Sequence, residues 1–188
     1  MYLKRLFDLL LAGSLAALLL LPALLVALAV KVTSKGPALY WSQRVGQNNR
    51  LFAMPKFRSM RVDAPVMATH LLADPRAHLT AIGSFLRKSS LDELPQLWSI
   101  LKGDMSFVGP RPALFNQYDL TAERTLQGVH KLVPGLTGWA QVNGRDELSL
   151  EEKVKFDAEY LQRQSFTFDL KIFWLTIAKV LGQHGVTH

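Results

Sequence analysis

The chain of 188 residues contains no cysteine, which excludes disulfide bonds and thiolate-ligated metal sites. Its five histidines are scattered, and none lies with acidic residues at a zinc-binding spacing. Acidic residues are also scarce, since 15 Asp and Glu stand against 22 Lys and Arg and leave a net charge of +7. This excess of positive charge indicates acidic partners, such as nucleic acid, anionic lipid or ligands that carry phosphate.

A long apolar segment without any charged residue lies near the N-terminus, from Leu9 to Val30. As a helix its 22 residues would extend about 33 Å, close to the hydrocarbon thickness of a bilayer, about 30 Å. A cleaved signal peptide is disfavoured, because the segment is too long and Asp8 interrupts its start. A single spanning helix and a re-entrant hairpin, which enters one leaflet and returns, both remain open.

Pro22 and the flanking charges favour the hairpin over a single span. A proline inside a helix removes one backbone hydrogen bond and kinks the helix. Basic residues flank both ends of the segment, with Lys4 and Arg5 before it and Lys31 and Lys35 after it. Basic residues are favoured on the cytoplasmic side, and only a hairpin places both flanks there. Spanning helices also tolerate proline, so the sequence does not exclude a span.

The rest of the chain, 31–188, holds 158 residues, which suits one globular domain with its own core. We therefore predict a membrane segment over 1–30 followed by one integrated cytoplasmic domain. Alternation, turn residues and helical periodicity predict the elements of this domain. In chain order they are strands over 38–45 and 51–60 joined by a turn over 46–49, a surface loop over 61–80, helices over 79–88 and 94–102, rigid loops over 103–112 and 134–145, and helices over 149–163 and 169–181.

Asp92 and Glu93 are adjacent carboxylates at a predicted helix start, and such a pair suits metal-assisted phosphoryl transfer. One carboxylate can be a nucleophile that forms a covalent intermediate. The other can hold Mg²⁺, which prefers carboxylates together with substrate phosphates. A structural alternative is a capping box from Ser90 to Glu93, because acids stabilise helix N-termini. Pro95 has no backbone N–H, so a helix with Ser90 as its N-cap would lose one hydrogen bond at this residue. If Asp92 were the N-cap, Pro95 would lie in the first turn, where no such bond is made.

Two loops with arginines, and one strand, offer groups that would contact phosphate. Arg111 lies between two prolines, whose fixed φ angles preorganise a guanidinium that suits phosphate oxygens. Arg145 ends an Asn-Gly-Arg turn, and Lys56 and Arg58 alternate on one face of a predicted strand. Each feature is also typical of a solvated turn or strand, so none is specific by itself.

Together these features form longer motifs. The chain resembles the bacterial sugar transferase family of monotopic phosphoglycosyl transferases, most strongly in FLRKSSLDELPQLWSILKGDMSFVGPRP at 85–112 and in PGLTGWAQVNGR at 134–145. Weaker matches are KRLFD at 4–8 and PKFRSM at 55–60. The resemblance covers nearly the whole chain.

The resemblance implies a reaction in which an aspartate attacks the β-phosphate of a UDP-sugar, UMP leaves, and polyprenyl (undecaprenyl) phosphate takes the sugar phosphate from the enzyme. By position the nucleophile is Asp92, and Glu93 is its partner in binding Mg²⁺. The implied partners are a UDP-sugar, polyprenyl phosphate and membrane lipid, without nucleic acid. The implied location is the cytoplasmic face of the bacterial inner membrane, where the reaction starts glycoconjugate assembly. The implied substrate-binding residues are Lys56, Arg58, Arg87, Arg111, Gln141, Asn143, Arg145 and Asp157.

The resemblance also implies the fold. The family's membrane segment is a re-entrant helix that is often broken at a Ser-Pro pair, and here Leu21 precedes Pro22, so the break depends on Pro22. The implied fold class is α/β, of α+β type, with a small sheet, several helices and amphipathic helices at the membrane interface. Phe173 and Trp174 on the last helix suit such an interface, and a core-facing helix explains them equally well.

Two other function classes compete with a transferase. A membrane-tethered binding protein would explain the positive charge and the apolar segment, but it would not explain a carboxylate pair accompanied by two arginine-bearing loops. A metal-dependent phosphohydrolase would use the same carboxylates with water as the acceptor. The linked motifs favour the transferase over both. The sequence identifies neither the sugar nor the oligomeric state.

If the apolar segment is a hairpin, the residues at both of its ends lie on the cytoplasmic side. Because the chain lacks cysteine, single cysteines placed at Tyr2 and Lys35 can be labelled selectively. We expect a membrane-impermeant thiol reagent to label neither position in intact cells and both positions after permeabilisation. Labelling of only one position in intact cells would establish a single span.

Overall fold

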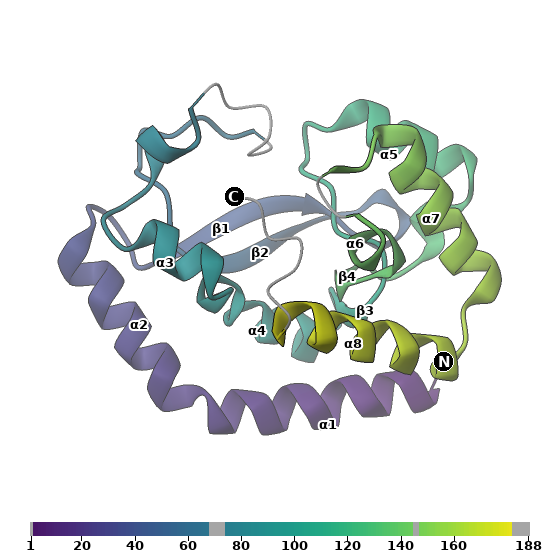
Figure 1. Cartoon of the computed structure of the whole chain (residues 1–188), viewed down its shortest axis with the longest axis horizontal. Helices are drawn as coiled ribbons and strands as arrows, with labels where there is room; N and C mark the ends of the chain where they lie inside the picture. Colours follow the sequence, from purple (N-terminus) through teal and green to yellow (C-terminus); the bar gives the residue numbers. More distant parts are fainter. Residues whose placement is uncertain (1, 68–73, 145–146, 182–188) are drawn as a thin grey trace.

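The structure combines helices with two small sheets of two strands each (Figure 1). A computed structural model describes residues 2–67, 74–144 and 147–181. The mixture of helices and strands confirms the predicted α/β class. The elements are α1 (Tyr2–Leu18), α2 (Leu20–Thr33), β1 (Leu39–Val45), η1 (Gln47–Asn49), β2 (Leu51–Phe57), η3 (Arg76–His78), α3 (Gly83–Lys88), η4 (Leu91–Glu93), α4 (Gln96–Lys102), β3 (Ser106–Val108), α5 (Tyr118–Leu126), η5 (Val129–Lys131), β4 (Gly135–Thr137), α6 (Trp139–Val142), α7 (Leu150–Arg163) and α8 (Phe166–Leu181).

The antiparallel hairpin of β1 and β2 forms where it is predicted. Leu39 pairs with Phe57, and Val45 pairs with Leu51. The predicted turn is the short 3₁₀ helix η1, in which Asn48 has a φ of 54°. Asparagine is one of the few residues that enter this left-handed region at low cost, so the turn residues suit the sharp reversal.

The helix predicted over 79–88 is present only in its second half, as α3. Leu79 instead forms an isolated bridge with Met60. The N–H of Thr80 donates to the carbonyl of Ser59 at 3.0 Å. These contacts with the chain that follows β2 explain why α3 starts late, and β2 itself ends before the predicted boundary at residue 60.

Two short strands, β3 and β4, lie in segments that the sequence predicts as loops. They pair in parallel, with Val108 opposite Thr137. The backbone at Gly109, directly after β3, lies very close to Gly135 of β4. A Cβ atom on Gly135 would lie 2.1 Å from the nitrogen of Gly109. Strands of three residues are too short to show alternation, so their pairing cannot be predicted from periodicity.

The apolar N-terminal segment forms α1 and α2, which are bent relative to each other by 62°. Pro22 lies in the first turn of α2 and has no N–H to donate to the carbonyl of Leu18, where α1 ends. The predicted helix break is therefore present. Among the described residues no single helix is long and apolar enough to cross a membrane, whereas the bent pair meets the same criteria of length and composition.

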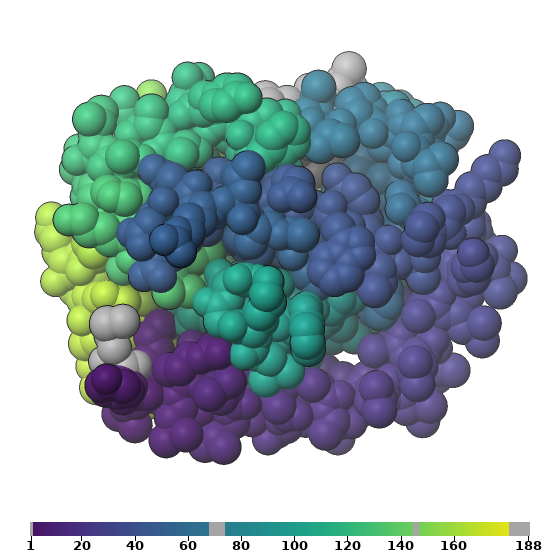
Figure 2. Space-filling model, turned by 180° about the vertical axis from the view of Figure 1, so that it is seen from behind, coloured from purple at the N-terminus to yellow at the C-terminus, as the bar shows by residue number. Residues whose placement is uncertain are grey.

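Helix α1 runs along one edge of the molecule beneath α4 and α8, and α2 turns away from it toward α3 (Figure 1). The inner face of α2 packs through Val30 against Phe57 and Leu86. Figure 2 shows the two helices along the lower margin of the opposite face of the molecule. Several apolar side chains on these helices are more than half exposed, namely Leu10, Leu18, Leu20, Leu21, Leu24, Leu25 and Leu28.

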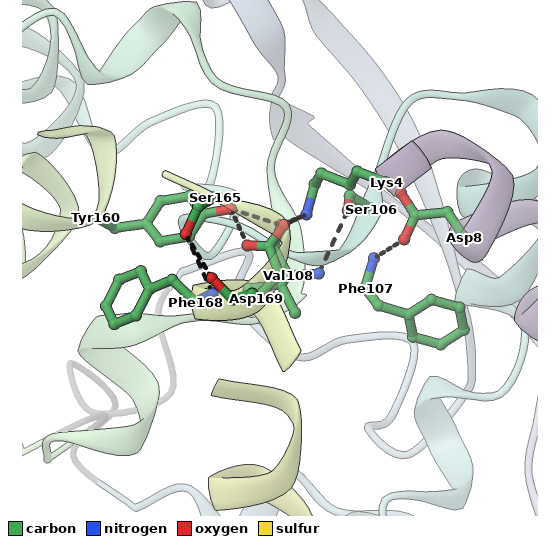
Figure 3. Close-up of polar contacts among 10 residues, drawn as sticks. Lys4, Asp8, Ser106, Phe107, Val108, Tyr160, Ser165, Phe168 and Asp169 are labelled. Atoms are coloured by element: carbon green, nitrogen blue, oxygen red, sulfur yellow. Dashed lines mark hydrogen bonds and ion pairs between the residues drawn. The ribbon is translucent and has the colours of Figure 1, made fainter. Parts of the chain in front are cut away.

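A buried polar network joins α1 to β3, α7 and α8 (Figure 3). The ammonium of Lys4 lies 2.7 Å from Asp169 Oδ2 and donates to the carbonyl of Val108 at 2.8 Å. The hydroxyl of Tyr160 donates to the other carboxylate oxygen of Asp169 at 2.6 Å. Burial and the negative charge of Asp169 both raise the pKa of Tyr160, so its hydroxyl keeps its proton. Asp8, which interrupts the apolar segment, accepts a backbone N–H of β3 at 3.1 Å.

The helix predicted over 149–163 is present as α7, and the predicted capping box at its start is confirmed. The N–H of Ser149 donates to the carboxylate of Glu152 at 2.8 Å, and the N–H of Glu152 donates to the hydroxyl of Ser149 at 3.2 Å. This helix buries Val154 and Tyr160 against the core.

The last helix, α8, begins at Phe166, three residues before the predicted start at Asp169. The hydroxyl of Ser165 accepts the N–H of Phe168 at 3.2 Å and supports this earlier first turn. The sequence left two explanations open for Phe173 and Trp174, a membrane interface and a core-facing helix. The two side chains differ in their positions. Phe173 lies inward, 6.0 and 6.1 Å from two phenylalanine rings of α1 and β3, whereas Trp174 is 66% exposed.

The bend between α1 and α2 should depend on Pro22. In Pro22→Ala the restored N–H can donate to the carbonyl of Leu18, so the two helices should approach one continuous helix. Spin labels on cysteines at Leu10 and Leu28, both exposed, should then lie farther apart in a pulsed dipolar measurement. Leu21→Ala is the matched control and should keep the distance of the parent protein. An unchanged distance in Pro22→Ala would mean that packing, not the proline, sets the bend.

Candidate active site

A cavity of about 300 Å³ lies between the β1-β2 hairpin, the chain that follows this hairpin, and the loop after β3. Its wall is strongly basic. Among the described residues, the carboxylate side chain in the wall is that of Asp92, and it stands among eight cationic side chains. Such a wall suits a ligand with several negative charges. The cationic residues are Arg44, Lys56, Arg58, Arg61, Arg87, Arg111, Arg124 and Lys153.

Asp92 lies on η4 and is 6% exposed. It follows Ser90, whose φ of 56° turns the chain sharply. Neither η4 nor α4 has a side-chain capping bond, and α4 begins only at Gln96, after Pro95. Both capping hypotheses are therefore wrong, because the chain forms a 3₁₀ turn where they require the start of an α-helix.

Burial raises the pKa of Asp92, and the ammonium of Lys56 opposes this rise. The carboxylate is thus held away from water at the edge of a basic cavity. A buried acid with a shifted pKa and nearby charges of opposite sign is a candidate for a functional group.

Glu93 points to the cations of the wall. Its Oε1 atom accepts a hydrogen bond from Lys56 Nζ at 2.8 Å and lies 3.3 Å from an Nη atom of Arg111. Burial lowers the pKa of Lys56, and the charge of Glu93 opposes this effect. The carboxylate of Glu93 therefore positions two of the cations that line the cavity.

Asp157 plays a similar part behind the wall. It is 1% exposed and lies 2.6 Å from Arg124, whose guanidinium also donates to the carbonyl of Arg111 at 2.8 Å. Burial raises the pKa of Asp157, and Arg124 opposes this rise. Asp157 does not line the cavity and instead positions Arg124, so its predicted contact with substrate stays a prediction.

The loop that carries Arg111 is fixed at its base by backbone hydrogen bonds. The N–H of Gly109 donates to Thr137 O, and the N–H of Gly135 donates to Pro110 O, both at 2.9 Å. These bonds extend the pairing of β3 and β4 into the loop. The guanidinium of Arg111 is thus anchored by its backbone and by Glu93.

Five of the eight predicted substrate-binding residues line the cavity, and the structure brings them together from four separate segments of the chain. Asn143 does not line it, because its side chain is exposed and donates to the carbonyl of Trp139 at 2.7 Å. Arg145 lies outside the described residues. The five that line the cavity are Lys56, Arg58, Arg87, Arg111 and Gln141.

The sequence interpretation missed Arg44 and Arg124. Burial and the neighbouring Arg111 lower the pKa of Arg44 to about 10. The sequence does carry a signal for Arg44, because Tyr40, Ser42 and Arg44 occupy alternate positions of β1 and alternate residues of a strand point to the same face. All three line the cavity. Arg124 gives no such signal, because its position depends on how α5 packs against α7.

The predicted Mg²⁺ site rests on Asp92 and Glu93. Across 2–67, 74–144 and 147–181, no group of three or more metal-ligating side chains could hold a metal ion. Mg²⁺ is commonly held by one or two carboxylates together with substrate phosphates and water. Asp92 lines the cavity, whereas Glu93 lies outside the lining and is bonded to Lys56, so the Mg²⁺ site at this pair stays a prediction.

Comparison with known proteins adds an independent finding. The sequence model of the bacterial sugar transferase family matches residues 1–183. The chain is 41% identical over 186 residues to the uncharacterized sugar transferase EpsL of Bacillus subtilis (strain 168), which covers 99% of this chain and 91% of that protein. It is 44% identical over 188 residues to the UDP-glucose:undecaprenyl-phosphate glucose-1-phosphate transferase of Escherichia coli (strain K12), covering 94% of this chain and 40% of that protein.

A third relative is the undecaprenyl-phosphate galactose phosphotransferase of Salmonella typhimurium (strain LT2), which is 38% identical over 205 residues. The match covers 98% of this chain and 41% of that protein. The chain therefore spans less than half the length of these two named transferases and most of the length of EpsL.

If Arg111 binds phosphate through its forked guanidinium, a lysine cannot replace it, because an ammonium keeps the charge and loses the fork. We expect Arg111→Lys to bind inorganic diphosphate about tenfold more weakly than the parent protein in titration calorimetry. Arg163→Lys is the matched control, since Arg163 pairs with Glu159 away from the cavity, and it should bind like the parent. Equal binding by Arg111→Lys would reduce Arg111 to a structural turn residue.

Proposed function

Because the chain belongs to the bacterial sugar transferase family, we propose that it is a phosphoglycosyl transferase that moves a sugar-1-phosphate from a UDP-sugar to undecaprenyl phosphate. Two relatives at about 40% identity are named as transferases that use undecaprenyl phosphate. The donor, the acceptor and the release of UMP are part of the proposal.

The observation that carries this proposal is the position of Asp92. Its carboxylate is buried in the wall of a cavity whose other charged side chains, among the described residues, are all cationic. A purely structural acid would be expected to pair directly with one of these cations, as Glu93 and Asp157 do. No hydrogen bond to Asp92 is found among the parts of the chain that the structure describes, so its oxygen atoms are available for chemistry.

The proposed reaction has two displacements at one phosphorus atom. In the first, a carboxylate oxygen of Asp92 bonds to the β-phosphorus, the bond from this phosphorus to the bridging oxygen breaks, and UMP leaves with that oxygen. In the second, a phosphate oxygen of undecaprenyl phosphate bonds to the same phosphorus, and the Asp92 carboxylate leaves. The enzyme returns to its first state and no proton or electron is left over.

The basic wall supports both steps. Lys56 and Arg111 are held by Glu93, and Arg124 is held by Asp157, so these cations are already placed before the donor arrives. Such preorganised charge stabilises the phosphate oxygens without reorganisation during the reaction. Mg²⁺ bound at the carboxylate pair would further reduce the repulsion between an anionic nucleophile and an anionic diphosphate.

The proposal extends to the membrane. We assign the bent pair of α1 and α2 to a re-entrant segment that enters the bacterial inner membrane from its cytoplasmic face, which places the cavity near a lipid-borne acceptor. The exposed leucines of both helices and the bend before Pro22 support this assignment. It also agrees with the basic residues at both ends of the segment.

A phosphohydrolase remains the competing function, because the same cavity would bind its substrate. It differs in its acceptor, since water would take the phosphorus in place of a lipid phosphate. Release of UMP that continues without any lipid would favour the hydrolase. Release that stops after one turnover and resumes on addition of undecaprenyl phosphate would favour the transferase.

The decisive experiment concerns Asp92. Incubated with a UDP-sugar and Mg²⁺ but no lipid, the enzyme should release at most about one UMP per molecule in a burst and gain the mass of a phosphosugar on the peptide that contains Asp92. Asp92→Asn should form no adduct, and Glu93→Gln should form it more slowly. Asp119→Asn, which changes an exposed acid in the first turn of α5, is the control and should behave like the parent.

Stability separates a chemical defect from a folding defect. Since folding raises the pKa of Asp92, the ionised carboxylate opposes folding at pH values above the folded pKa. Asp92→Asn should therefore melt at the same temperature as the parent or higher at neutral pH, and this advantage should vanish as pH falls. A normal burst in Asp92→Asn, or UMP release only when lipid is present, would refute the assignment of Asp92 as the nucleophile.

A further inference from the structure

Gln141, on α6, is a neutral residue in the basic wall of the cavity. Its amide oxygen and its amide nitrogen are both buried, and neither has a hydrogen-bond partner in the part of the chain that the structure describes. Two other neutral polar side chains of the same wall, Gln117 and Ser42, are already bonded. The amide oxygen of Gln117 accepts the N–H of Leu114 at 2.8 Å, and the hydroxyl of Ser42 accepts from Arg44 at 3.0 Å.

An amide buried without either hydrogen bond is unfavourable for folding alone, because buried polar groups are nearly always paired. The position of this amide is also closely confined. A Cβ atom on Gly138 would lie 2.7 Å from the amide oxygen of Gln141 and 2.1 Å from the carbonyl oxygen of Gly109. The chain therefore has a residue without a side chain where the amide needs room, and it leaves the amide unpaired at the cavity wall.

The geometry of a primary amide restricts its ligand. Its donor and its acceptor point the same way, so one ligand satisfies both only if it has an acceptor and a donor on the same edge. A phosphate group has acceptors only. An acetamido group on a sugar has its N–H and its C=O on opposite edges, because a secondary amide is trans. The ring of uracil holds an N–H beside a C=O on one edge and fits both atoms.

We propose that Gln141 binds the uracil base of the nucleotide sugar, with its amide oxygen accepting the N3–H of the base and its amide nitrogen donating to an adjacent carbonyl. This inference rests on the proposed function, which makes a UDP-sugar the donor. It divides the cavity into a cationic part that holds the diphosphate beside Asp92 and a neutral part at α6 that holds the base.

A contact with the base is made equally before and during the transfer of phosphorus. It therefore contributes to the binding of the nucleotide and leaves the chemical step unchanged. Loss of the Gln141 amide should raise KM for the UDP-sugar and leave kcat nearly unchanged. A residue that positions the reacting phosphate would instead lower kcat.

The test uses four ligands and two variants in titration calorimetry. The ligands are UDP, N3-methyl-UDP, which lacks the N3–H, a UDP-N-acetylhexosamine and inorganic diphosphate. Gln141→Leu removes both polar atoms at nearly constant size, and Gln162→Leu, at an exposed site on α7, is the matched control. We expect Gln141→Leu to bind UDP about tenfold more weakly and diphosphate as tightly as the parent, because only the base contact is lost.

The methylated ligand supplies a cycle that measures the contact itself. The parent should bind N3-methyl-UDP about tenfold more weakly than UDP, whereas Gln141→Leu should bind both ligands alike. Gln141→Leu should also melt no lower than the parent, since an unpaired buried amide has been replaced by an apolar group. If the variant fails to fold, the comparison of UDP with N3-methyl-UDP on the parent protein still tests the proposal, because equal binding of the two ligands would overturn it.

Several outcomes would overturn the proposal. Suppose that the parent binds UDP more tightly than diphosphate, and that Gln141→Leu binds UDP as tightly as the parent does. The base is then bound elsewhere, and the proposed function stands. If Gln141→Leu binds UDP normally but loses affinity for a UDP-N-acetylhexosamine, the amide recognises the sugar. If the parent binds UDP no more tightly than diphosphate, the uridine donor of the proposed function fails together with this inference.

Discussion

The ammonium of Lys4 lies 2.7 Å from the carboxylate of Asp169, and this contact fixes where the apolar helix α1 meets the rest of the protein. Both side chains are largely removed from water, so each depends on the other for compensation of its charge. Loss of either partner would leave a buried charge unpaired, which costs more than the pair contributes. The pair therefore acts as a strict condition on position, because α1 docks only where Lys4 can reach Asp169.

This condition extends toward the cavity through the backbone. Lys4 donates to the carbonyl of Val108 at 2.8 Å, and the hydroxyl oxygen of Tyr160, whose proton is directed to Asp169, lies 3.3 Å from the same carbonyl (Figure 3). The next residues form the loop that carries Arg111, and Gly109 is bonded in turn to β4. The apolar segment and the loop that carries Arg111 are therefore joined by one continuous set of hydrogen bonds, although they lie about a hundred residues apart in sequence.

The sequence correctly predicted those parts of the fold that interactions between residues close in sequence determine. The hairpin of β1 and β2, the capping box of α7 and the break before Pro22 all follow from neighbouring residues. The sequence interpretation failed where a distant contact decides the outcome. Asp8 looked like an interruption of the apolar segment and instead bonds to β3, and the bond between Asp157 and Arg124 joins α7 to α5 in a way that no local pattern predicts.

The placement of the acids explains how a cavity with many cations stays folded. Glu93 and Asp157 lie outside the lining of the cavity. Glu93 pairs with Lys56 and Arg111, Asp157 pairs with Arg124, and both acids reduce the repulsion among these cations. The two carboxylates position these cations and lie outside the cavity lining, so they do not occupy the space in which an anion would bind. Asp92 lies in the wall itself, where burial raises its pKa and Lys56 opposes that rise. In the proposed reaction this carboxylate can approach a phosphate only if the surrounding cations offset the repulsion between the two anions. The proposed nucleophile and the cations around it therefore depend on each other.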